Sequence, residues 1–244
     1  MHLKIRAIQS HRMPFDSSLE ILSEINSNPD DIIVFPEKFI TTKIDAHGLK
    51  RILDVININN TIILGSLSYI DQNLYNRSFI IKNKQIIGWQ DKINLYSKES
   101  IYYTPGSELK LFAVNGLKIG ILVCYDLDFP DYPRFLFRQH CDIIFNPSLI
   151  RKDFHDEWHL YANARALENR IPVVSVNSIS DDFLGDSIVV IPETCEGGVR
   201  INSITSRYND IVADINTENY IDSREKRLAE ENTMLDKVTK THEL

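Results

Sequence analysis

Continuous apolar runs alternate with stretches of helical spacing along the whole chain, and this alternation restricts the possible folds more than any other feature. The runs DIIVFPE (31–37) and TIILGSLSYI (61–70) each have the length of a buried strand, while the apolar residues of 46–56 recur as in a helix. Uninterrupted apolar strands usually belong to a sheet that is covered on both faces. The pattern therefore predicts an α/β fold.

Further strands and helices continue this alternation. Two hairpins are predicted where short strands meet, at Asn83–Lys84 and at Asn115–Gly116, and Asn-Gly is a very strong turn signal. A strand at 3–10 precedes a helix at 17–25. Helices are also expected at about 131–140 and 155–169, and strands at 141–147, 173–178, 186–192 and 210–215.

The sequence is interpreted as one domain over residues 1–244. Its 244 residues suffice for one large α/β domain with a substantial core. Neither a repeat nor a Gly/Ser/Pro-rich linker divides the chain. The last stretch, 217–244, is charged and permits a helix, so we expect a C-terminal arm that lies on the surface or against a partner.

Charge and cysteine usage limit the partners and the compartment. The net charge is −7 and no basic block occurs, which disfavours nucleic acid and anionic membranes as partners. No apolar run approaches the length of a membrane span, and the N-terminus lacks a signal-peptide core. The three cysteines, at 124, 141 and 195, are odd in number and widely spaced, as expected for free thiols in the cytoplasm.

Cys124 is the strongest candidate for a reactive group. It ends the apolar run LKIGILV and begins the polar turn YDLDFPDYP. A nucleophile at such a junction is exposed at the edge of a sheet, and the N–H of Tyr125 can then face a substrate oxygen. A buried structural cysteine fits this segment equally well. For Cys141, in an apolar strand, and Cys195, in an expected hairpin loop, the structural interpretation is favoured.

Three further side chains supply what a reactive thiol needs. Glu37 follows the buried strand 31–37, Lys92 follows the strand QIIGWQD, and Glu99 lies in the next loop. Taken singly, each is most simply an exposed charged residue. Together with Cys124 they provide a nucleophile, a group that carries the proton and a cation that stabilises an oxyanion. These are the groups that cysteine-based acyl transfer requires.

The segments FPEKF, KINLY and LVCYDLDFP resemble the hallmark motifs of the nitrilase superfamily, the carbon–nitrogen hydrolases, and occur in the expected order. The similarity continues through TPGSEL, NPSL, ARALEN and GDSIVVIP to about residue 215. The resemblance implies a four-layer αββα sandwich of two mixed sheets with outer helices. It also implies catalytic roles for Glu37, Lys92 and Cys124, and favours Glu99, rather than Glu108, as a second acidic residue.

The activity implied by this resemblance is hydrolysis of a small amide through a cysteine thioester, with release of ammonia or an amine and without metal or cofactor. Hydrolysis of a nitrile or an N-carbamoyl group by the same residues is an alternative. A non-catalytic binding or assembly module and a redox-sensing thiol are rival interpretations. Related proteins pair their subunits, so a homodimer or a higher even-numbered oligomer is expected, with contacts from 125–135, 155–169 and 217–244.

Asp128 departs from the family pattern, because many members carry Arg four residues after the cysteine. If Asp128 faces the pocket, it should disfavour a carboxylate-bearing substrate and attract a cation. In the alternative interpretation it points away and pairs with Arg134 or Arg138. The reaction class is the same in both interpretations, and only the substrate differs.

The segment HDEWH resembles a zinc site only superficially. His155 and His159 are one helical turn apart, but Asp156 occupies the place of the glutamate of HExxH, and no third ligand is evident. We interpret the pair as hydrogen-bonded or surface histidines. Three residues separate Arg165 from Glu168 on the same predicted helix, and we expect an ion pair there.

Overall fold

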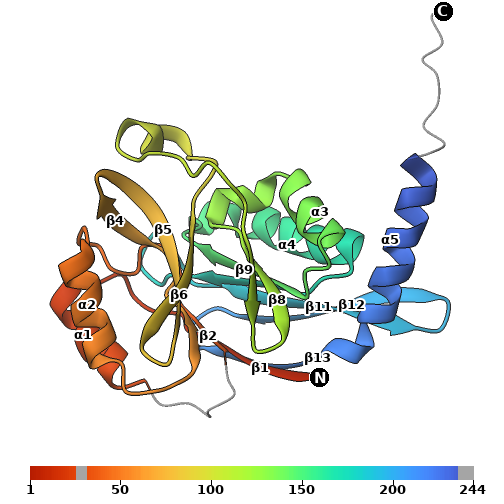
Figure 1. The fold of residues 1–244 in the computed structure, drawn as a ribbon, viewed down its shortest axis with the longest axis horizontal. Helices are drawn as coiled ribbons and strands as arrows, with labels where there is room; N and C mark the ends of the chain where they lie inside the picture. Colours follow the sequence, from red (N-terminus) through yellow and green to blue (C-terminus); the bar gives the residue numbers. More distant parts are fainter. Residues whose placement is uncertain (26–31, 236–244) are drawn as a thin grey trace, which may run out of the picture.

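The computed structural model describes residues 1–25 and 32–235, which form two mixed β-sheets with helices outside them (Figure 1). The first sheet has the strand order β13-β1-β2-β3-β5-β4, with β6 also paired to β5. Its strands are β1 (His2–Ala7), β2 (Ile32–Val34), β3 (Thr61–Ile63), β4 (Leu67–Asp71), β5 (Asn73–Lys82), β6 (Gln85–Asp91) and β13 (Ile211–Asn216).

The second sheet has the order β12-β11-β10-β9-β8-β7, in which β8, β9 and β10 run parallel. Its strands are β7 (Leu111–Val114), β8 (Leu117–Ile121), β9 (Ile143–Ser148), β10 (Val173–Asn177), β11 (Ser187–Cys195) and β12 (Gly198–Ser206). The helices are α1 (Phe15–Ser23), α2 (Ala46–Val55), α3 (Asp131–Arg138), α4 (His155–Asn169) and α5 (Ile221–Leu235).

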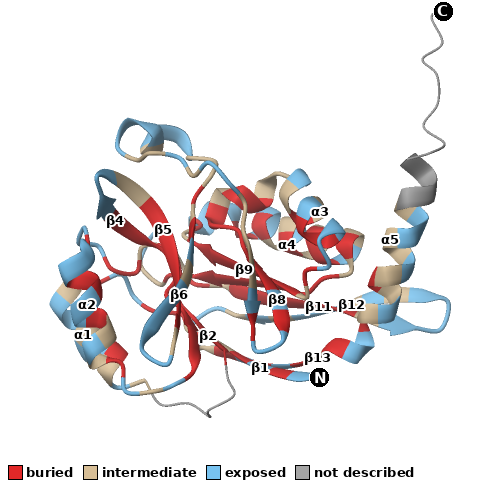
Figure 2. Ribbon diagram, viewed as in Figure 1, coloured by how far each residue is buried: buried red, intermediate tan, exposed pale blue. Residues whose placement is uncertain are grey.

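Alternation along β2 explains the layers. Ile32 and Val34 belong to the core that the two sheets share, whereas Ile33 faces the other way and packs with Leu49 and Ile52 of α2. Successive side chains of a strand point to opposite faces, so an all-apolar strand needs a partner on each side. The central strands are accordingly coloured as buried along much of their length (Figure 2). The predicted α/β fold with two mixed sheets and outer helices is confirmed.

The apolar run 61–70 is two strands rather than the single strand that was predicted. Gly65 separates β3 from β4 and has φ +52°, a conformation that favours glycine. A Cβ at Gly65 would lie 2.0 Å from the carbonyl oxygen of Pro36, so the two backbones approach each other closely. The neighbouring Ser66 forms a β-bridge with Glu37. The residues between β3 and β4 therefore hold the segment that carries Glu37 in place.

Strand β12 was not predicted, because its sequence GVRINSITS is largely polar. The two predicted hairpins are present, since β5 pairs with β6 around Asn83–Lys84 and β7 pairs with β8 around Asn115–Gly116. Helix α4 has the predicted bounds. Residue 31 of the predicted strand 31–37 lies outside the described residues.

Helix α5 packs against the rest of its own subunit. Tyr220, just before the helix, is fully buried and its hydroxyl donates to the carbonyl oxygen of Asp142 over 2.8 Å. Arg224 forms a 2.8 Å ion pair with the Asp142 carboxylate, and Glu231 accepts hydrogen bonds from α3. The beginning of the predicted arm 217–244 is thus part of the folded subunit, while 236–244 lie outside the described residues.

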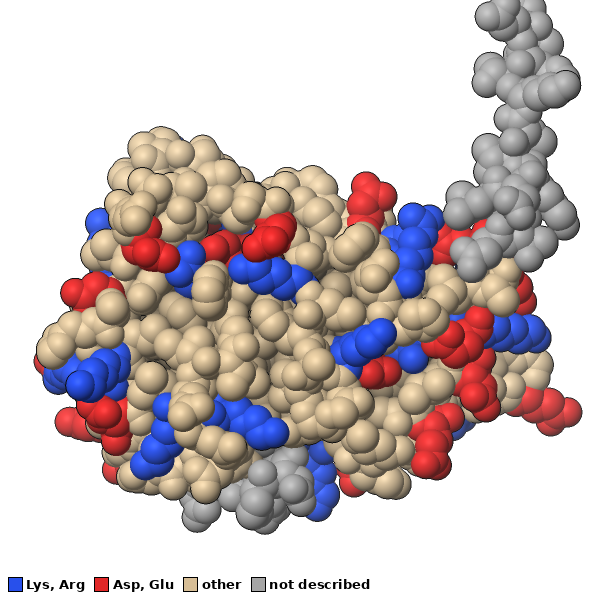
Figure 3. Space-filling model, viewed as in Figure 1, with Lys and Arg blue, Asp and Glu red and all other residues tan. Residues whose placement is uncertain are grey.

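The surface in Figure 3 carries basic and acidic side chains interspersed on the face shown, without a large patch of one sign. This distribution is unlike the continuous basic surface that nucleic acid requires. Among the described helices, none combines the length and the apolar character needed to cross a membrane.

Candidate active site

Glu37 lies just beyond the C-terminal end of β2, where the backbone is held between the two sheets. Its N–H donates to the carbonyl oxygen of Ser148 over 3.2 Å, and its bridge to Ser66 fixes the other side. The side chain is only 3% exposed. Oε1 accepts a 2.6 Å hydrogen bond from the amide of Asn76, so one carboxylate oxygen is fixed in orientation.

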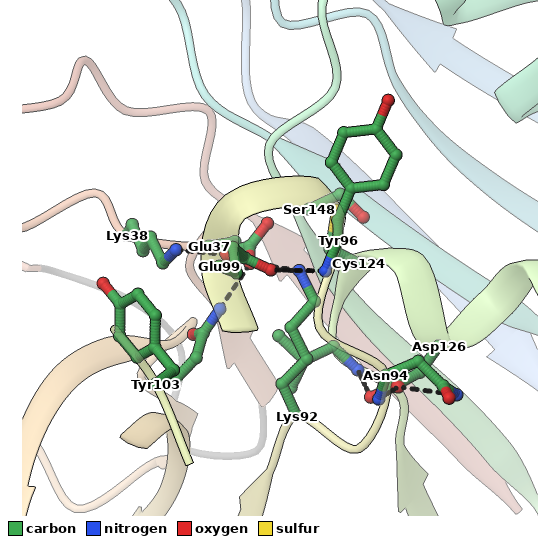
Figure 4. A network of polar contacts seen from close by, with 12 residues as sticks. Glu37, Lys38, Lys92, Asn94, Tyr96, Glu99, Tyr103, Cys124, Asp126 and Ser148 are labelled. Atoms are coloured by element: carbon green, nitrogen blue, oxygen red, sulfur yellow. Dashed lines mark hydrogen bonds and ion pairs between the residues drawn. The ribbon is translucent and has the colours of Figure 1, made fainter. Parts of the chain in front are cut away.

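Lys92 follows directly after β6 and reaches back to Glu37 (Figure 4). Its N–H donates to the carbonyl oxygen of Asn76, and its side chain is 2% exposed. The ammonium nitrogen lies 3.0 Å from Glu37 Oε1 and 2.8 Å from Glu99 Oε2. One buried cation therefore lies between two carboxylates.

Cys124 is the first residue of a short 3₁₀ helix, Cys124–Asp128, that follows strand β8. Its φ is +47°, the left-handed region that is costly for a residue with a side chain. The amide of Asn146 donates to the carbonyl oxygens of Leu122 and Cys124, over 2.6 and 3.2 Å, and supports this conformation from β9. Such strained turns after a strand are typical of nucleophiles.

The six residues that the sequence singled out line one cavity of about 450 Å³. They come from four segments: the end of β2, the start of the loop after β6, the 3₁₀ helix Ser97–Ile101, and the turn after β8. The structure thus brings together Glu37, Lys92, Glu99, Cys124, Tyr125 and Asp128. None of them lies on a different face of the molecule.

Opposed charges set the protonation of the cation and its loop partner. Burial alone would lower the pKa of Lys92, but the interactions with Glu37, the Cys124 sulfur and Glu99 outweigh it and raise that pKa. Burial would raise the pKa of Glu99, yet Lys92 and Lys38 lower that pKa to about 2. Lys92 is therefore an ammonium and Glu99 a carboxylate at neutral pH.

The Cys124 thiol is protonated at neutral pH. Burial raises the pKa of Cys124 well above its usual value, and the Glu37 charge adds to this, while Lys92 and a backbone hydrogen bond from Leu149 lower the pKa in part. The Glu37 carboxylate interacts directly with the thiol. A base is thus in place to remove the thiol proton as the sulfur attacks.

Two residues that the sequence analysis did not select complete this network. The Lys38 ammonium pairs with the other oxygen of Glu99 and lies 4.3 Å from the centre of the Tyr103 ring. The Asp126 carboxylate accepts hydrogen bonds from the N–H groups of the Lys92 loop and the nucleophile turn. Both residues lie within the hallmark segments FPEKF and LVCYDLDFP, but neither motif shows where a side chain points.

Asp128 does not pair with Arg134 or Arg138, so that alternative is wrong. Both arginines bind Glu231 of α5, Arg134 over 3.4 Å and Arg138 over 2.9 Å. Oδ1 of Asp128 is buried and has no hydrogen-bond partner among the described residues. Burial raises the pKa of Asp128, and the charge of Arg165 lowers it in part.

His155 and His159 both form polar contacts with other residues of the chain. His155 is buried, with Nε2 3.1 Å from the carbonyl oxygen of Ile150 and Nδ1 3.3 Å from the Asp186 carboxylate. His159 Nε2 lies 2.7 Å from the Asp186 carbonyl oxygen. Within the described residues, no group of three or more potential His, Cys, Asp or Glu ligands is arranged to hold a metal ion.

The ion pair expected on α4 and the structural interpretation of Cys141 are confirmed. Arg165 and Glu168 form an ion pair of 2.7 Å on α4. Cys141 is fully buried, as the structural interpretation expects. Cys195 lies at the hairpin between β11 and β12 as predicted, but it is exposed, so it is not a buried structural cysteine.

The sequence model of the family described as carbon-nitrogen hydrolase matches residues 14–194. The 2-oxoglutaramate amidase of Bacillus subtilis (strain 168) is 28% identical over 194 residues, covering 71% of this chain and 74% of that protein. A probable nitrilase of Schizosaccharomyces pombe is 29% identical over 118 residues, which cover 47% of this chain and 43% of that protein.

Solved structures share the fold. Nit3 of Saccharomyces cerevisiae, a member of branch 10 of the nitrilase superfamily, matches with a TM-score of 0.76 and 22% identity over 92% of this chain and 93% of that chain. An amidase variant from Nesterenkonia sp. AN1, with acrylamide added at its active-site cysteine, matches with a TM-score of 0.71 and 17% identity over 94% and 99%. At these identities the matches establish the fold and nothing about the substrate.

Proposed function

The chain belongs to the carbon–nitrogen hydrolase family, and we propose that it hydrolyses the C–N bond of a small linear amide through a thioester on Cys124. The observation that carries this proposal is the Lys92 ammonium between Glu37 and Glu99, in the cavity that also contains Cys124. Relatives named 2-oxoglutaramate amidase and omega-amidase favour amides over nitriles and N-carbamoyl groups.

In the proposed first half-reaction, Glu37 removes the Cys124 proton while the sulfur attacks the carbonyl carbon. The carbonyl π electrons move to oxygen, and the oxyanion is stabilised by the Lys92 ammonium and the N–H of Tyr125. Glu37 then gives its proton to the leaving nitrogen as the C–N bond breaks, because an amide anion is a very poor leaving group. Ammonia or an amine leaves, and the acyl group remains on sulfur.

In the second half-reaction, Glu37 removes a proton from water, which attacks the thioester carbonyl at the same oxyanion site. The C–S bond breaks, the sulfur regains a proton through Glu37, and the carboxylic acid is released. Glu99 orients Lys92 and contributes to the wall against which the substrate amide lies. The position of Lys92 and its raised pKa support this division of roles, since the cation keeps its charge in a closed site.

We propose that the protein works as a two-fold dimer, or a higher even-numbered assembly, in the cytoplasm. Support for pairing comes from Phe135 on α3, which is 45% exposed although it is a large aromatic residue. All three cysteines are free, as is usual in a reducing compartment.

The function is tested by measuring ammonia release from a panel of small linear amides, with matched nitriles and N-carbamoyl compounds in parallel. We expect turnover of one or more amides by the wild-type enzyme and none by Cys124→Ala, which keeps the fold because the volume change is small. Absence of turnover across the panel, or equal turnover by the variant, would contradict the proposal. Conversion of nitriles alone would replace amidase by nitrilase.

A further inference from the structure

Beyond the catalytic side chains, the wall of the cavity is mainly aromatic. Tyr96 and Tyr125 contact each other edge to face at 5.1 Å between ring centres, and Trp158 and Tyr161 do so at 6.2 Å. The aromatic residues of the wall are Tyr96, Tyr125, Phe154, Trp158, Tyr161 and Phe183. Aromatic faces attract cations and repel anions, most strongly where water is excluded.

Asp128 brings a carboxylate into this aromatic part of the cavity. Its Oδ1 is buried without a hydrogen-bond partner among the described residues, which is costly for a carboxylate oxygen. The charge of the nearby Arg165 acts on this carboxylate, but the hydrogen bonds of Arg165 go to other acceptors. Its N–H groups donate to the carbonyl oxygens of Leu127 and Asp128 and to the carboxylate of Glu168. Asp128 lines the cavity and forms no ion pair among the described residues, so a ligand can meet its carboxylate at the oxygen other than the buried Oδ1.

Two further charged residues line the cavity outside the catalytic group, and both are at its exposed rim. Arg151 is 59% exposed and lies 3.5 Å from the carboxylate of Asp153. Glu157, in the first turn of α4, is also exposed. Charges in contact with water are strongly screened, and a half-buried charge is screened less. Asp128 therefore has the largest influence on the charge of a bound molecule.

We propose that Asp128 and the aromatic wall form a binding site for a protonated amine at the end of the amide substrate remote from the bond that is cleaved. This inference rests on the proposed amide hydrolysis and names its substrate class. The amide end lies at Cys124 and the amine at Asp128, with the apolar linker against the rings. An ammonium pairs with the Asp128 carboxylate and is held by the aromatic faces, so both features of the cavity are used.

Binding to the inactive Cys124→Ala variant tests this site independently of turnover. The ligands are ω-amino amides from 3-aminopropanamide to 6-aminohexanamide, each compared by calorimetry with the amide in which a methyl group replaces the ammonium. We expect at least one amine to bind about tenfold or more tightly than its methyl counterpart, the range of a hydrogen bond to a charged group. Equal or weaker binding of every amine would overturn the proposal.

The matched substitutions separate Asp128 from a general effect of negative charge. Asp128→Asn on the Cys124→Ala background keeps the shape and should abolish the preference for the amine. Asp131→Asn is the control, because Asp131 lies at the exposed start of α3 and lines a separate groove. It should leave the preference intact. A preference that survives Asp128→Asn, or is lost equally in both variants, would contradict the assignment.

Kinetics of the active enzyme distinguish failure of this inference from failure of the proposed function. The ratio of kcat/KM for the amine to that for its methyl counterpart should fall about tenfold to a hundredfold in Asp128→Asn, mainly through KM. Faster cleavage of carboxylate-bearing amides, lost on Arg151→Gln, would retain the hydrolase and overturn the amine site. No cleavage of any amide, together with amine-selective binding, would overturn the hydrolase and retain the site.

Discussion

The carboxylate of Asp126 accepts a 2.7 Å hydrogen bond from the backbone N–H of Asn94, which connects the turn carrying Cys124 to the loop carrying Lys92. The same carboxylate accepts bonds of 3.2 Å from the N–H groups of Ile93 and Val123. One buried side chain therefore fixes the distance between two elements of the proposed machinery, although it does not itself line the cavity wall.

The first prediction concerns the pH dependence of stability. Burial raises the pKa of Asp126 to about 6, against hydrogen bonds from Asn94, Ile93 and Val123 and the Lys92 charge, which lower the pKa. Between about pH 4 and pH 6 the folded state therefore keeps a proton that the unfolded state has lost. The stability due to this proton is fully present below about pH 4 and is lost as pH rises through 6.

The free energy of unfolding of the wild type minus that of Asp126→Asn should therefore fall by about 3 kcal/mol or less between pH 4 and pH 7. Urea unfolding of the wild type and of Asp126→Asn across this pH range measures the difference. The contributions of groups that titrate alike in both proteins cancel from it. A difference that rises with pH would show that the three N–H groups outweigh burial. In Asp126→Asn we also expect lower kcat, because one amide oxygen cannot accept three hydrogen bonds in the same geometry.

The second prediction concerns the close approach of the Gly65 backbone to that of Pro36, the residue before Glu37. Gly65→Ala should destabilise the fold by about 3 kcal/mol or more, because Gly65 has φ +52° and the added Cβ would lie 2.0 Å from the Pro36 carbonyl oxygen. It should also lower kcat, since relief of the clash moves the segment that carries Glu37. Gly198→Ala is the control, because a Cβ there meets nothing within 4 Å. Thermal unfolding that shows equal stability for the two variants would contradict this role of Gly65.

Lys38 provides the third prediction. It shares Glu99 with Lys92, and burial, which would lower its pKa, is outweighed by Glu37 and Glu99, so that its pKa is raised. In Lys38→Met the full charge of Glu99 acts on Lys92 and weakens its attraction for the oxyanion. We expect kcat to fall about tenfold with little change in KM, as for an interaction made in the transition state.

Lys38→Arg should recover part of kcat, because a cation again faces Glu99. Lys43→Met is the control for loss of a lysine, because Lys43 is exposed and does not line the cavity. Steady-state kinetics on one amide suffice for this comparison. An unchanged kcat in Lys38→Met, or a loss seen only in KM, would limit Lys38 to a structural role.

The fourth prediction concerns assembly. At 28.2 kDa per chain, a dimer has a mass of 2 × 28.2 = 56.4 kDa. Light scattering at micromolar concentration should report this mass or a higher even multiple of 28.2 kDa, and the exposed Phe135→Asp should lower it. A monomer of the wild type at that concentration would refute the proposal.

The sequence predicted the segments whose pattern is local. Apolar runs and helical spacing identify the buried strands and α4, and Asn115–Gly116 identifies its hairpin, because neighbours in sequence determine these features. Strand β12 was missed because its pairing with β11, not its own polar residues, makes it a strand. The interruption at Gly65 depends on its close approach to Pro36, which follows β2 and is distant in sequence, so no local pattern predicts it.

The candidate site shows the same division. Glu37, Lys92 and Cys124 could be selected because together they supply the groups of cysteine-based acyl transfer and because their segments resemble the hallmark motifs of the carbon–nitrogen hydrolases. The roles of Lys38 and Asp126 depend on which way a side chain points after folding. The preference of Arg134 and Arg138 for Glu231 over Asp128 could not be predicted either, since it is determined by the docking of α5.

The central claim is that Cys124 forms a thioester with the acyl group of an amide, and rapid-quench mass spectrometry of the intact protein tests it directly. Enzyme mixed with a cleaved amide and quenched in acid should gain the mass of the acyl group, on the peptide that contains Cys124, as the first ammonia is released. The added mass should decay to free enzyme as the acid appears. Ammonia release from an enzyme whose Cys124 stays unmodified throughout the first turnover would contradict the account.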